Sequence, residues 1–157
     1  MFLFVGLGNP GCNYAMNRHN VGFMAVDLLA YSRDFPAWQR KAASLQTIGK
    51  IDESKIILLK PQSYMNKSGL PVAELARFHQ ISENNIFVFH DELDLAAGRV
   101  RVKHGGGHGG HNGLRDIDRH LGQDYWRVRI GIGRPDNPAI TVKSWVLADF
   151  SKMEING

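Results

Sequence analysis

The chain has 157 residues, 43% of them hydrophobic, which is enough for one well-packed domain and too few for two ordinary ones. Its 19 Lys and Arg residues against 15 Asp and Glu give a formal net charge of +4, which favours an acidic partner such as nucleic acid without requiring one. Cys12 is the only cysteine, which excludes an internal disulfide framework and suits a reducing compartment such as the cytoplasm. No run approaches the roughly 18 apolar residues of a membrane-spanning helix, and no Lys or Arg precedes the apolar residues 2–5, which argues against a signal peptide. We therefore expect a soluble protein.

Strand and helix patterns alternate along the first half of the chain. Residues 2–6 are a short apolar run that stops at glycine and proline, as expected of a buried strand followed by a turn. From Asn20 onward, apolar side chains recur at the spacing of one helix face. Residues 44–51 and 55–60 flank a polar turn and predict a hairpin, and residues 70–78 predict a second helix.

The second half continues the alternation. Residues 86–89 predict a buried strand, and residues 98–104 alternate valine with arginine and lysine, which predicts a half-exposed strand with a basic face. Residues 105–113 are too rich in glycine to hold regular structure. A short helix over residues 114–121 and a last strand over residues 125–132 follow.

This order of elements predicts the fold class. Strands that alternate with helices indicate an α/β fold, and the antiparallel hairpin makes the sheet mixed. We therefore expect a single three-layer domain with a mixed, mostly parallel twisted sheet flanked by helices. No internal repeat or low-complexity segment interrupts it.

Polar side chains that suit catalysis lie in four loops that follow predicted strands. In such a sheet, ligands bind outside the carboxyl ends of the strands. The loops would bring together His19, Asp91, His111, Asn9, Asn66 and Asn112. Each of these residues alone also has an ordinary structural interpretation as a helix cap, a turn former or a surface residue.

Together, these residue types indicate hydrolysis. A histidine has a free pKa of about 6.5 and can take a proton from water near neutral pH, while a carboxylate on its other nitrogen fixes the tautomer. Neutral asparagine amides can hold a peptide backbone and stabilise an oxyanion. No nucleophile elbow is present and Cys12 has no assigned base, so water is the predicted attacking group.

The glycine-rich residues 105–113 indicate that a ligand comes close to the backbone there. Ordering so many glycines costs conformational entropy without any gain in packing. A phosphate bound by free N–H groups at the start of the following helix would fit. Mobility without a function is the alternative interpretation.

One alternative function is nucleotide binding. Gly6, Gly8 and Gly11 satisfy the spacing of a dinucleotide fingerprint after a strand. That fingerprint should run directly into a helix and be followed by an acid at the end of a second strand. Here Pro10 interrupts the loop and Asp27 lies within the helical stretch, so the match is weak.

Two further alternatives are a metal site and a non-enzymatic RNA-binding module. The metal site would use His104, His108 and His111, although no cysteine accompanies them and helical spacing does not apply in a glycine-rich loop. The RNA-binding module would use Arg99, Arg101, Lys103, Arg127 and Arg129 with Tyr125 and Trp126. A solvated basic strand face is the ordinary interpretation of the same residues.

Six segments, in order along the chain, resemble the bacterial-type peptidyl-tRNA hydrolases. They are GLGNPG at residues 6–11 with Tyr14, RHNVG at 18–22, KPQSYMNKSG at 60–69, HDELDL at 90–95, GGGHGGHNGL at 105–114 with Asp116, and RIGIG at 129–133. The resemblance covers residues 2–150. It implies an enzyme that uses water to cut the ester between a peptide and the 3′-terminal ribose of tRNA.

The resemblance also implies roles for individual residues. His19 would be the general base and Asp91 its partner, and Lys103 and Arg129 would clamp a tRNA phosphate at the 5′ end. The substrate-binding residues would be Asn9, Tyr14, Tyr64, Asn66, His111 and Asn112, with Tyr64 lining the channel and His111 auxiliary. The family is monomeric and cytoplasmic, binds peptidyl-tRNA, and uses no metal or organic cofactor.

The end of the chain departs from the resemblance. Residues 1–150 are predicted to be the peptidyl-tRNA hydrolase-like domain. Residues 151–157 are predicted to be a short tail in place of the C-terminal helical segment with which family members usually continue.

Overall fold

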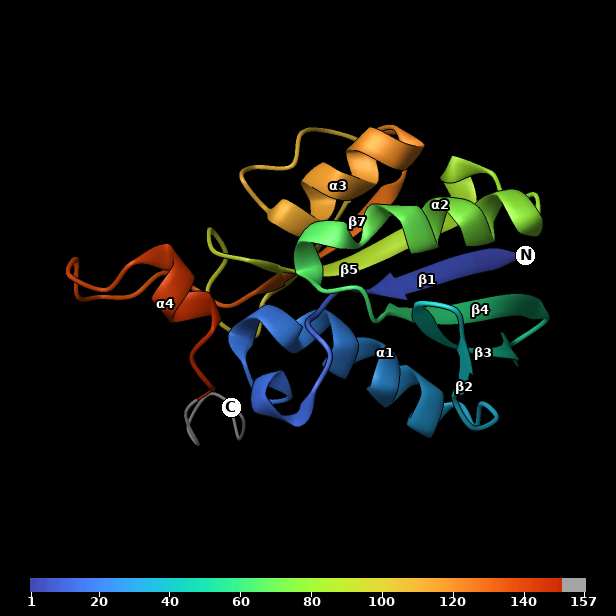
Figure 1. Ribbon diagram of the computed structural model, residues 1–157, viewed down its shortest axis with the longest axis horizontal. Helices are drawn as coiled ribbons and strands as arrows, with labels where there is room; N and C mark the ends of the chain where they lie inside the picture. Colours follow the sequence, from blue (N-terminus) through green and yellow to red (C-terminus); the bar gives the residue numbers. More distant parts are fainter. Residues whose placement is uncertain (151–157) are drawn as a thin grey trace.

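A seven-stranded mixed sheet forms the centre of residues 1–150, the part of the chain that the computed structural model describes (Figure 1). Its strands are β1 (Phe2–Gly6), β2 (Gln39–Lys41), β3 (Ser44–Ile51), β4 (Ser54–Pro61), β5 (Ile86–Glu92), β6 (Val100–His104) and β7 (Trp126–Gly131). Their order across the sheet is β2-β3-β4-β1-β5-β7-β6. Neighbours among β4, β1, β5 and β7 are parallel, and antiparallel pairings add β3, β2 and β6 at the two sides. The predicted mixed sheet is confirmed, and the predicted tail at residues 151–157 lies outside the described residues.

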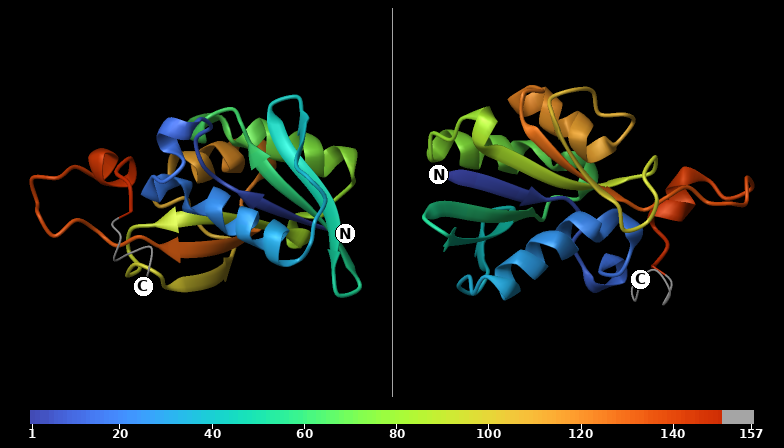
Figure 2. Two further views of the ribbon diagram at one scale, coloured as in Figure 1. Left: turned by 90° about the horizontal axis from the view of Figure 1, so that it is seen from below. Right: turned by 180° about the vertical axis from the view of Figure 1, so that it is seen from behind.

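Helices cover both faces of the sheet and give the three expected layers (Figures 1 and 2). The helices are α1 (Val21–Ser32) on one face, α2 (Gly69–Phe78) and α3 (Asn112–Leu121) on the other, and α4 (Val142–Val146) beyond the carboxyl ends of the parallel strands. The 3-10 turns are η1 (Cys12–Tyr14), η2 (Arg18–Asn20), η3 (Met65–Lys67) and η4 (Glu83–Asn85). The chain runs from β1 through α1 to β4, and then back through α2 to β5 on the other side of β1. Right-handed crossovers that run in opposite directions place their helices on opposite faces, which accounts for the two helical layers.

Apolar side chains fill the space on both sides of the sheet. The buried core under α2 and α3 contains Leu3, Val5, Leu7, Ile57, Leu59, Met65, Val72, Ala76, Ile86, Val88, Leu114, Ile117 and Tyr125. On the α1 side, Ile56 and Leu58 pack with Phe4, Phe35 and Trp38. Because β1 and β4 have helical layers on both faces, both are continuous apolar runs in the sequence rather than alternating ones.

The strand order creates a topological switch point between β1 and β5. The chain leaves β1 toward β4 on one side and leaves β5 toward β7 on the other. Ligands of open α/β sheets bind in the crevice that such a reversal opens at the carboxyl ends of the strands. The loop after β1 and the end of β5 therefore flank the expected position of a functional site.

Two expectations about the far edge of the sheet are wrong. The strand predicted over residues 98–104 was expected to be half-buried, but β6 is an edge strand whose residues are all exposed, with Val100 and Val102 at 56% and 58%. Arg127, which the RNA-binding alternative places on a solvated basic face, is only 2% exposed. The alternation of residue types looks the same in an edge strand and an inner strand, so the sequence did not distinguish them.

Other differences concern the limits of elements. β5 continues through Glu92 because His90, Asp91 and Glu92 remain paired with β7, and neither β2 nor α4 was predicted. Both β2 and α4 are short, too short for a repeating pattern of apolar residues to be recognised. None of the helices within residues 1–150 has the length and apolar character needed to cross a membrane.

Candidate active site

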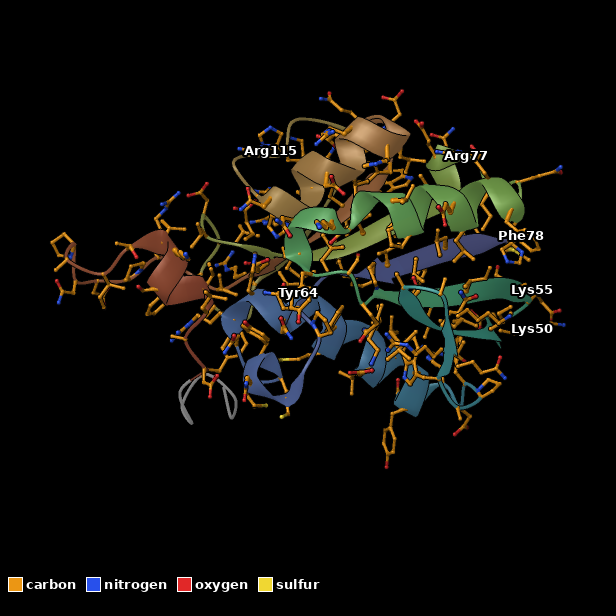
Figure 3. The ribbon with its side chains drawn as sticks, in the orientation of Figure 1. Lys50, Lys55, Tyr64, Arg77, Phe78 and Arg115 are labelled. Carbon is orange, nitrogen blue, oxygen red and sulfur yellow. The ribbon has the colours of Figure 1, made fainter. Side chains whose placement is uncertain are left out.

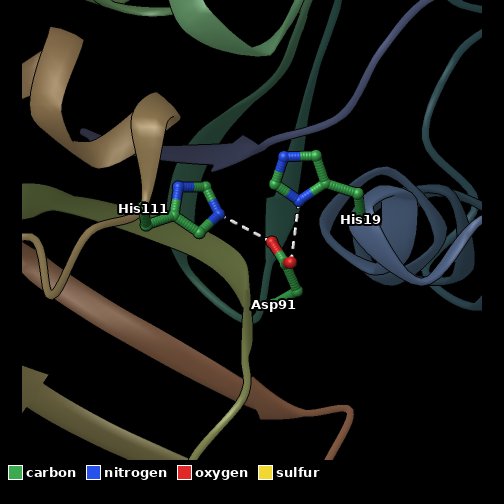
Figure 4. Close-up of side chains that lie close together, drawn as sticks. All are labelled: His19, Asp91 and His111. Atoms are coloured by element: carbon green, nitrogen blue, oxygen red, sulfur yellow. Dashed lines mark hydrogen bonds and ion pairs between the residues drawn. The ribbon is translucent and has the colours of Figure 1, made fainter. Parts of the chain in front are cut away.

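Asp91 lies between two histidines at the carboxyl end of β5 (Figure 4). Its Oδ2 atom is 2.7 Å from Nδ1 of His19, and its Oδ1 atom is 2.6 Å from Nε2 of His111. His19 belongs to η2, just before α1, and His111 is the N-cap residue of α3. Three segments that are distant in sequence therefore meet at one carboxylate, beside the switch point.

The two histidines determine the charge state of Asp91. Burial of this carboxyl would by itself raise its pKa. The electrostatic interactions with His111 and His19 and their hydrogen bonds oppose burial, and they hold the pKa of Asp91 well below its usual range. Asp91 is therefore a carboxylate near neutral pH and can accept a hydrogen bond at each oxygen.

Hydrogen bonds determine which ring nitrogens carry hydrogen. Nδ1 of His111 accepts from the backbone N–H groups of Gly113 (3.1 Å) and Leu114 (3.3 Å), so the hydrogen of this ring is on Nε2, which donates to Asp91. The other carboxylate oxygen accepts from Nδ1 of His19. Nε2 of His19 is then left with a lone pair, which is the form that a general base requires.

The same cluster has the spacing of a metal site but not the hydrogen pattern of one. Ligand atoms of His19, Asp91 and His111 lie within 4.8 Å of one another. A metal would need a lone pair on Nε2 of His111, whereas the two N–H groups of α3 that point at Nδ1 keep the hydrogen on Nε2. The arrangement therefore suits proton transfer better than metal ligation.

α4 and the residues directly after it fix the position of η2. The backbone N–H of Arg18 donates to Ala148 (3.0 Å), and its guanidinium lies 3.5 Å from the centre of the Trp145 ring. Nδ2 of Asn17 donates to Asp149 at 2.7 Å. These partners stand about 130 residues away in the chain, so no local pattern in the sequence could have revealed them. These contacts hold Asn17 and Arg18, the two residues directly before His19, in place.

Hydrogen bonds hold the backbone and the side-chain oxygen of Asn9, and its side-chain nitrogen stays available to donate to a ligand. Its Oδ1 atom accepts from the backbone N–H of Met65 at 2.7 Å, which identifies the oxygen of this side chain. The side chain of Asn20 bonds the backbone of Asn9 twice, at 2.8 Å each. Sequence analysis missed Asn20, which is 1% exposed; its position directly after His19 is the only signal. Nδ2 of Asn9 remains as a donor beside the site.

The other predicted substrate-binding residues lie on η1, on the loop before η3, on η3 and at the start of α3. Asn66 is exposed on η3, Asn112 is exposed as the first residue of α3, and Tyr14 is half-buried on η1. Tyr64 is exposed at the same end of the sheet (Figure 3) and has φ 69 and ψ 157, a region that is nearly restricted to glycine and costs about 1–3 kcal/mol. The hydrogen bond of Asn9 to the next residue, Met65, helps to hold this strained backbone.

The glycine-rich loop is anchored by a buried arginine. The guanidinium of Arg127 donates to the carbonyl oxygens of Gly106 (2.7 Å), Gly107 (3.0 Å) and Gln123 (3.3 Å) and lies over the ring of Tyr125. Arg127 is therefore a structural anchor of the loop rather than part of an RNA-binding surface. These hydrogen bonds hold Gly106 and Gly107, the start of the loop, against β7.

The two predicted phosphate-binding residues lie on neighbouring strands. Lys103 pairs with Arg127 and Arg101 with Arg129, so Lys103 and Arg129 are diagonal neighbours on one face of the sheet. Lys103 is exposed, and its ammonium lies over Gly106 of the loop. Nε of Arg129 is 3.0 Å from Oε1 of Glu92, so a phosphate would compete with this carboxylate for Arg129.

The structure argues against two of the alternatives, the metal site of three histidines and the dinucleotide fingerprint. His104 bonds Asn84 and His108 accepts from Gly110, while His111 bonds Asp91, so the three histidines do not form one site. The loop after β1 enters the short turn η1, and α1 begins only at Val21. The glycines of residues 6–11 therefore do not open a helix, as a dinucleotide fingerprint requires.

His90 is a buried histidine beneath the site. Burial, followed by its proximity to His111, lowers the pKa of His90 from the ordinary 6.5 to about 3. Its Nδ1 atom is 2.8 Å from the carbonyl oxygen of Asp91 and donates to it. The native protein thus keeps His90 neutral at pH values at which the unfolded chain protonates it.

We expect stability to fall as the pH is lowered below 6.5, because the unfolded chain then binds a proton that the native state excludes from His90. The free energy of unfolding falls by at most about 1.4 kcal/mol for each pH unit, and it continues to fall until the pH approaches 3, the pKa of His90 in the folded protein. Asp91 adds to the loss only once the pH falls toward the ordinary carboxyl value of 3.8, because its pKa in the folded protein lies below that value. The free energy of unfolding, measured with urea, should depend less on pH between 7.5 and 5 in His90→Asn than in the parent. An equal pH dependence in the two proteins would contradict this role of His90.

Comparison with known proteins identifies the family. A model of the peptidyl-tRNA hydrolase family matches residues 3–156. The chain belongs to the peptidyl-tRNA hydrolase family. A peptidyl-tRNA hydrolase from Rhodospirillum centenum is 55% identical over 154 residues, which are 98% of this chain and 67% of that protein. One from Zymomonas mobilis is 50% identical, over 98% of this chain and 81% of its own length.

Solved structures of the family have the same fold. The crystal structure of peptidyl-tRNA hydrolase from Acinetobacter baumannii superimposes with a TM-score of 0.93 at 43% identity, covering 99% of this chain and 79% of that one. A crystal structure of the complex of peptidyl-tRNA hydrolase with N-propanol gives the same TM-score. The expected family and fold are confirmed, and the family match extends beyond the domain boundary predicted at residue 150.

Proposed function

We propose that this protein hydrolyses the ester between a peptide and the 3′-terminal ribose of tRNA. Membership of the peptidyl-tRNA hydrolase family supports the substrate and the reaction. The observation that carries the chemistry is the hydrogen bond between His19 and Asp91, which leaves Nε2 of His19 as a proton acceptor at the carboxyl end of β5.

The proposed reaction begins with a water molecule beside Nε2 of His19. The imidazole takes a proton from this water, and Asp91 stabilises the imidazolium that forms. The hydroxide oxygen attacks the ester carbonyl, the tetrahedral intermediate collapses, and the ribose oxygen leaves with the proton returned by His19. The products are a peptide with a free carboxylate and a tRNA with a free 3′ end.

Asparagine amides are proposed to stabilise the oxyanion and to hold the peptide and the 3′ end. Nδ2 of Asn9 is free to donate because Met65 occupies Oδ1. Asn66 and Asn112 are exposed on η3 and α3, which pack together beside the site. Tyr14 and Tyr64 would contact the substrate from η1 and from the loop before η3.

Lys103 and Arg129 are proposed to bind a phosphate at the 5′ end of the tRNA. We expect Lys103→Ala to raise the apparent KM for tRNA substrates and to reduce the slope of log affinity against log salt by about one, because one fewer counterion is released. Lys50→Ala is the matched control, because Lys50 (Figure 3) lies on β3, toward the other side of the sheet from β6. Initial rates over a series of salt concentrations give both values. An unaltered salt slope would show that Lys103 is merely a solvated lysine.

We also propose that the protein works as a cytoplasmic monomer without a metal ion or organic cofactor. The resemblance of its motifs to the family supports these points, and the hydrogen on Nε2 of His111 argues against a metal at the cluster. Activity that survives a strong chelator, together with a monomer mass in solution, is the expected result. Loss of activity on chelation, restored by a divalent ion, would contradict the proposal.

The proposed function is tested by release of an N-acetylated amino acid from its tRNA. Purified protein should release the acid and leave the tRNA intact, at a rate proportional to enzyme concentration. Tight binding of tRNA without release would instead favour a non-enzymatic RNA-binding protein.

A further inference from the structure

We propose that His111 is a positioning residue for the general base rather than a substrate-binding residue: it ties the N-terminus of α3 to Asp91 and thereby fixes the carboxylate that orients His19. This inference rests on the proposed function and assigns His111 a role within it. It is carried by the hydrogen bonds at both nitrogens of the ring.

Both polar atoms of His111 are already used inside the protein. Nδ1 accepts from the N–H groups of Gly113 and Leu114, which are N2 and N3 of α3, so the ring serves as the helix N-cap. Nε2 donates to Oδ1 of Asp91 at 2.6 Å. The side chain is 10% exposed, and neither nitrogen remains for a substrate.

Neighbouring rings prevent His111 from turning away. Its ring centre lies 5.2 Å from that of His19 and 5.2 Å from that of His90, and the His90 contact is edge to face. The carboxylate is bonded by His19 from η2 and His111 from α3, while His90 of β5 bonds the backbone carbonyl of Asp91 and also feels the charge of Arg127. The rigid helix α3 therefore sets the direction from which Asp91 is held.

The second hydrogen bond has two consequences for the base. It fixes the rotation of the Asp91 carboxylate, so that Oδ2 points at Nδ1 of His19. It also fixes the acceptor that keeps the hydrogen of His19 on Nδ1. Without His111, the carboxylate could rotate, and the His19 tautomer with a lone pair on Nε2 would no longer be enforced.

His111→Asn separates the two bonds of this residue. Asparagine is among the best N-cap residues, so it retains the bonds to α3, but its side chain is too short to reach Asp91 at the same time. We expect an unchanged melting temperature, an unchanged KM and a kcat reduced about tenfold, and nitrogen NMR should show a smaller fraction of His19 with its hydrogen on Nδ1. His111→Ala should show the same kinetic changes with a lower melting temperature, because the cap is also lost.

His120→Asn is the matched control. It places the same substitution on the same helix, at a histidine that bonds the backbone of Asp116 rather than the site. Its kcat and the nitrogen NMR signals of His19 should equal those of the parent. His19→Ala is measured in parallel, so that an error in the proposed function can be recognised separately from an error about His111.

The outcomes distinguish the possibilities. A raised KM with a parental kcat in His111→Asn would overturn the inference and make His111 a substrate-binding residue. Parental kinetics in His111→Asn with an inactive His19→Ala would overturn the inference alone, whereas an active His19→Ala would overturn the proposed base. In the parent, nitrogen NMR should show hydrogen on Nε2 of His111 and on Nδ1 of His19; hydrogen on Nδ1 of His111 would contradict the proposal without any variant.

Discussion

His19→Ala should lower kcat by about 10²–10⁴ while affinity for the tRNA substrate is retained. The imidazole offers a free lone pair at the site, because Asp91 occupies its Nδ1 atom and leaves Nε2 as a proton acceptor. The substitution removes the base but leaves Asn9, Lys103 and the core unchanged. Single-turnover rates with enzyme in excess, together with substrate affinity measured separately, give the two quantities.

His79→Ala is the control for this measurement. His79 is the C-cap residue of α2, at the end of the helix remote from the site. Parental rates in this variant would show that loss of a histidine does not by itself slow the reaction. Parental turnover in His19→Ala would remove the general-base role from this residue.

Asp91→Asn should lower kcat by about 10⁴, a larger effect than loss of one charge explains. Nε2 of His111 carries hydrogen because α3 occupies Nδ1, so the amide oxygen of the new asparagine must face His111. Its NH₂ group then points at Nδ1 of His19. His19 has to accept there and carry its hydrogen on Nε2, which removes the lone pair that the base needs.

Asp94→Asn provides the comparison for Asp91→Asn. Asp94 belongs to the same HDELDL segment but is exposed and pairs with Arg134. Its substitution should leave kcat unchanged. Pre-steady-state rates and nitrogen NMR of His19 measure the two parts of the prediction, and a His19 ring that still carries hydrogen on Nδ1 in Asp91→Asn would contradict this mechanism.

Local patterns in the sequence were sufficient for most of the fold. The strand predicted over residues 44–51 agrees with β3 because its apolar run ends at a polar turn on one side. The end of β5 was placed too early, since Asp91 stays in the sheet through its pairing with Ile130, far along the chain. The exposed edge strand β6 was also misjudged, because exposure depends on what covers a strand and not on the strand itself.

The sequence predicted which residues of the candidate site come together, but not how they are bonded. The rule that ligands bind at the carboxyl ends of strands correctly brought His19, Asp91 and His111 together. The direction of each hydrogen bond could not be predicted, because it depends on the backbone N–H groups of α3. Arg127 resembles the other basic residues in sequence, and only burial under the glycine-rich loop reveals its role as an anchor.

The central claim is that water activated by His19 attacks the ester directly. The most direct test is a single turnover of N-acetylated aminoacyl-tRNA in ¹⁸O-labelled water, with the intact mass of the protein measured at each quenched time point. The account predicts an unmodified protein throughout and an oxygen atom from solvent in the released carboxylate. An acyl adduct on His19 or on Cys12 that forms and decays at the rate of turnover would contradict it.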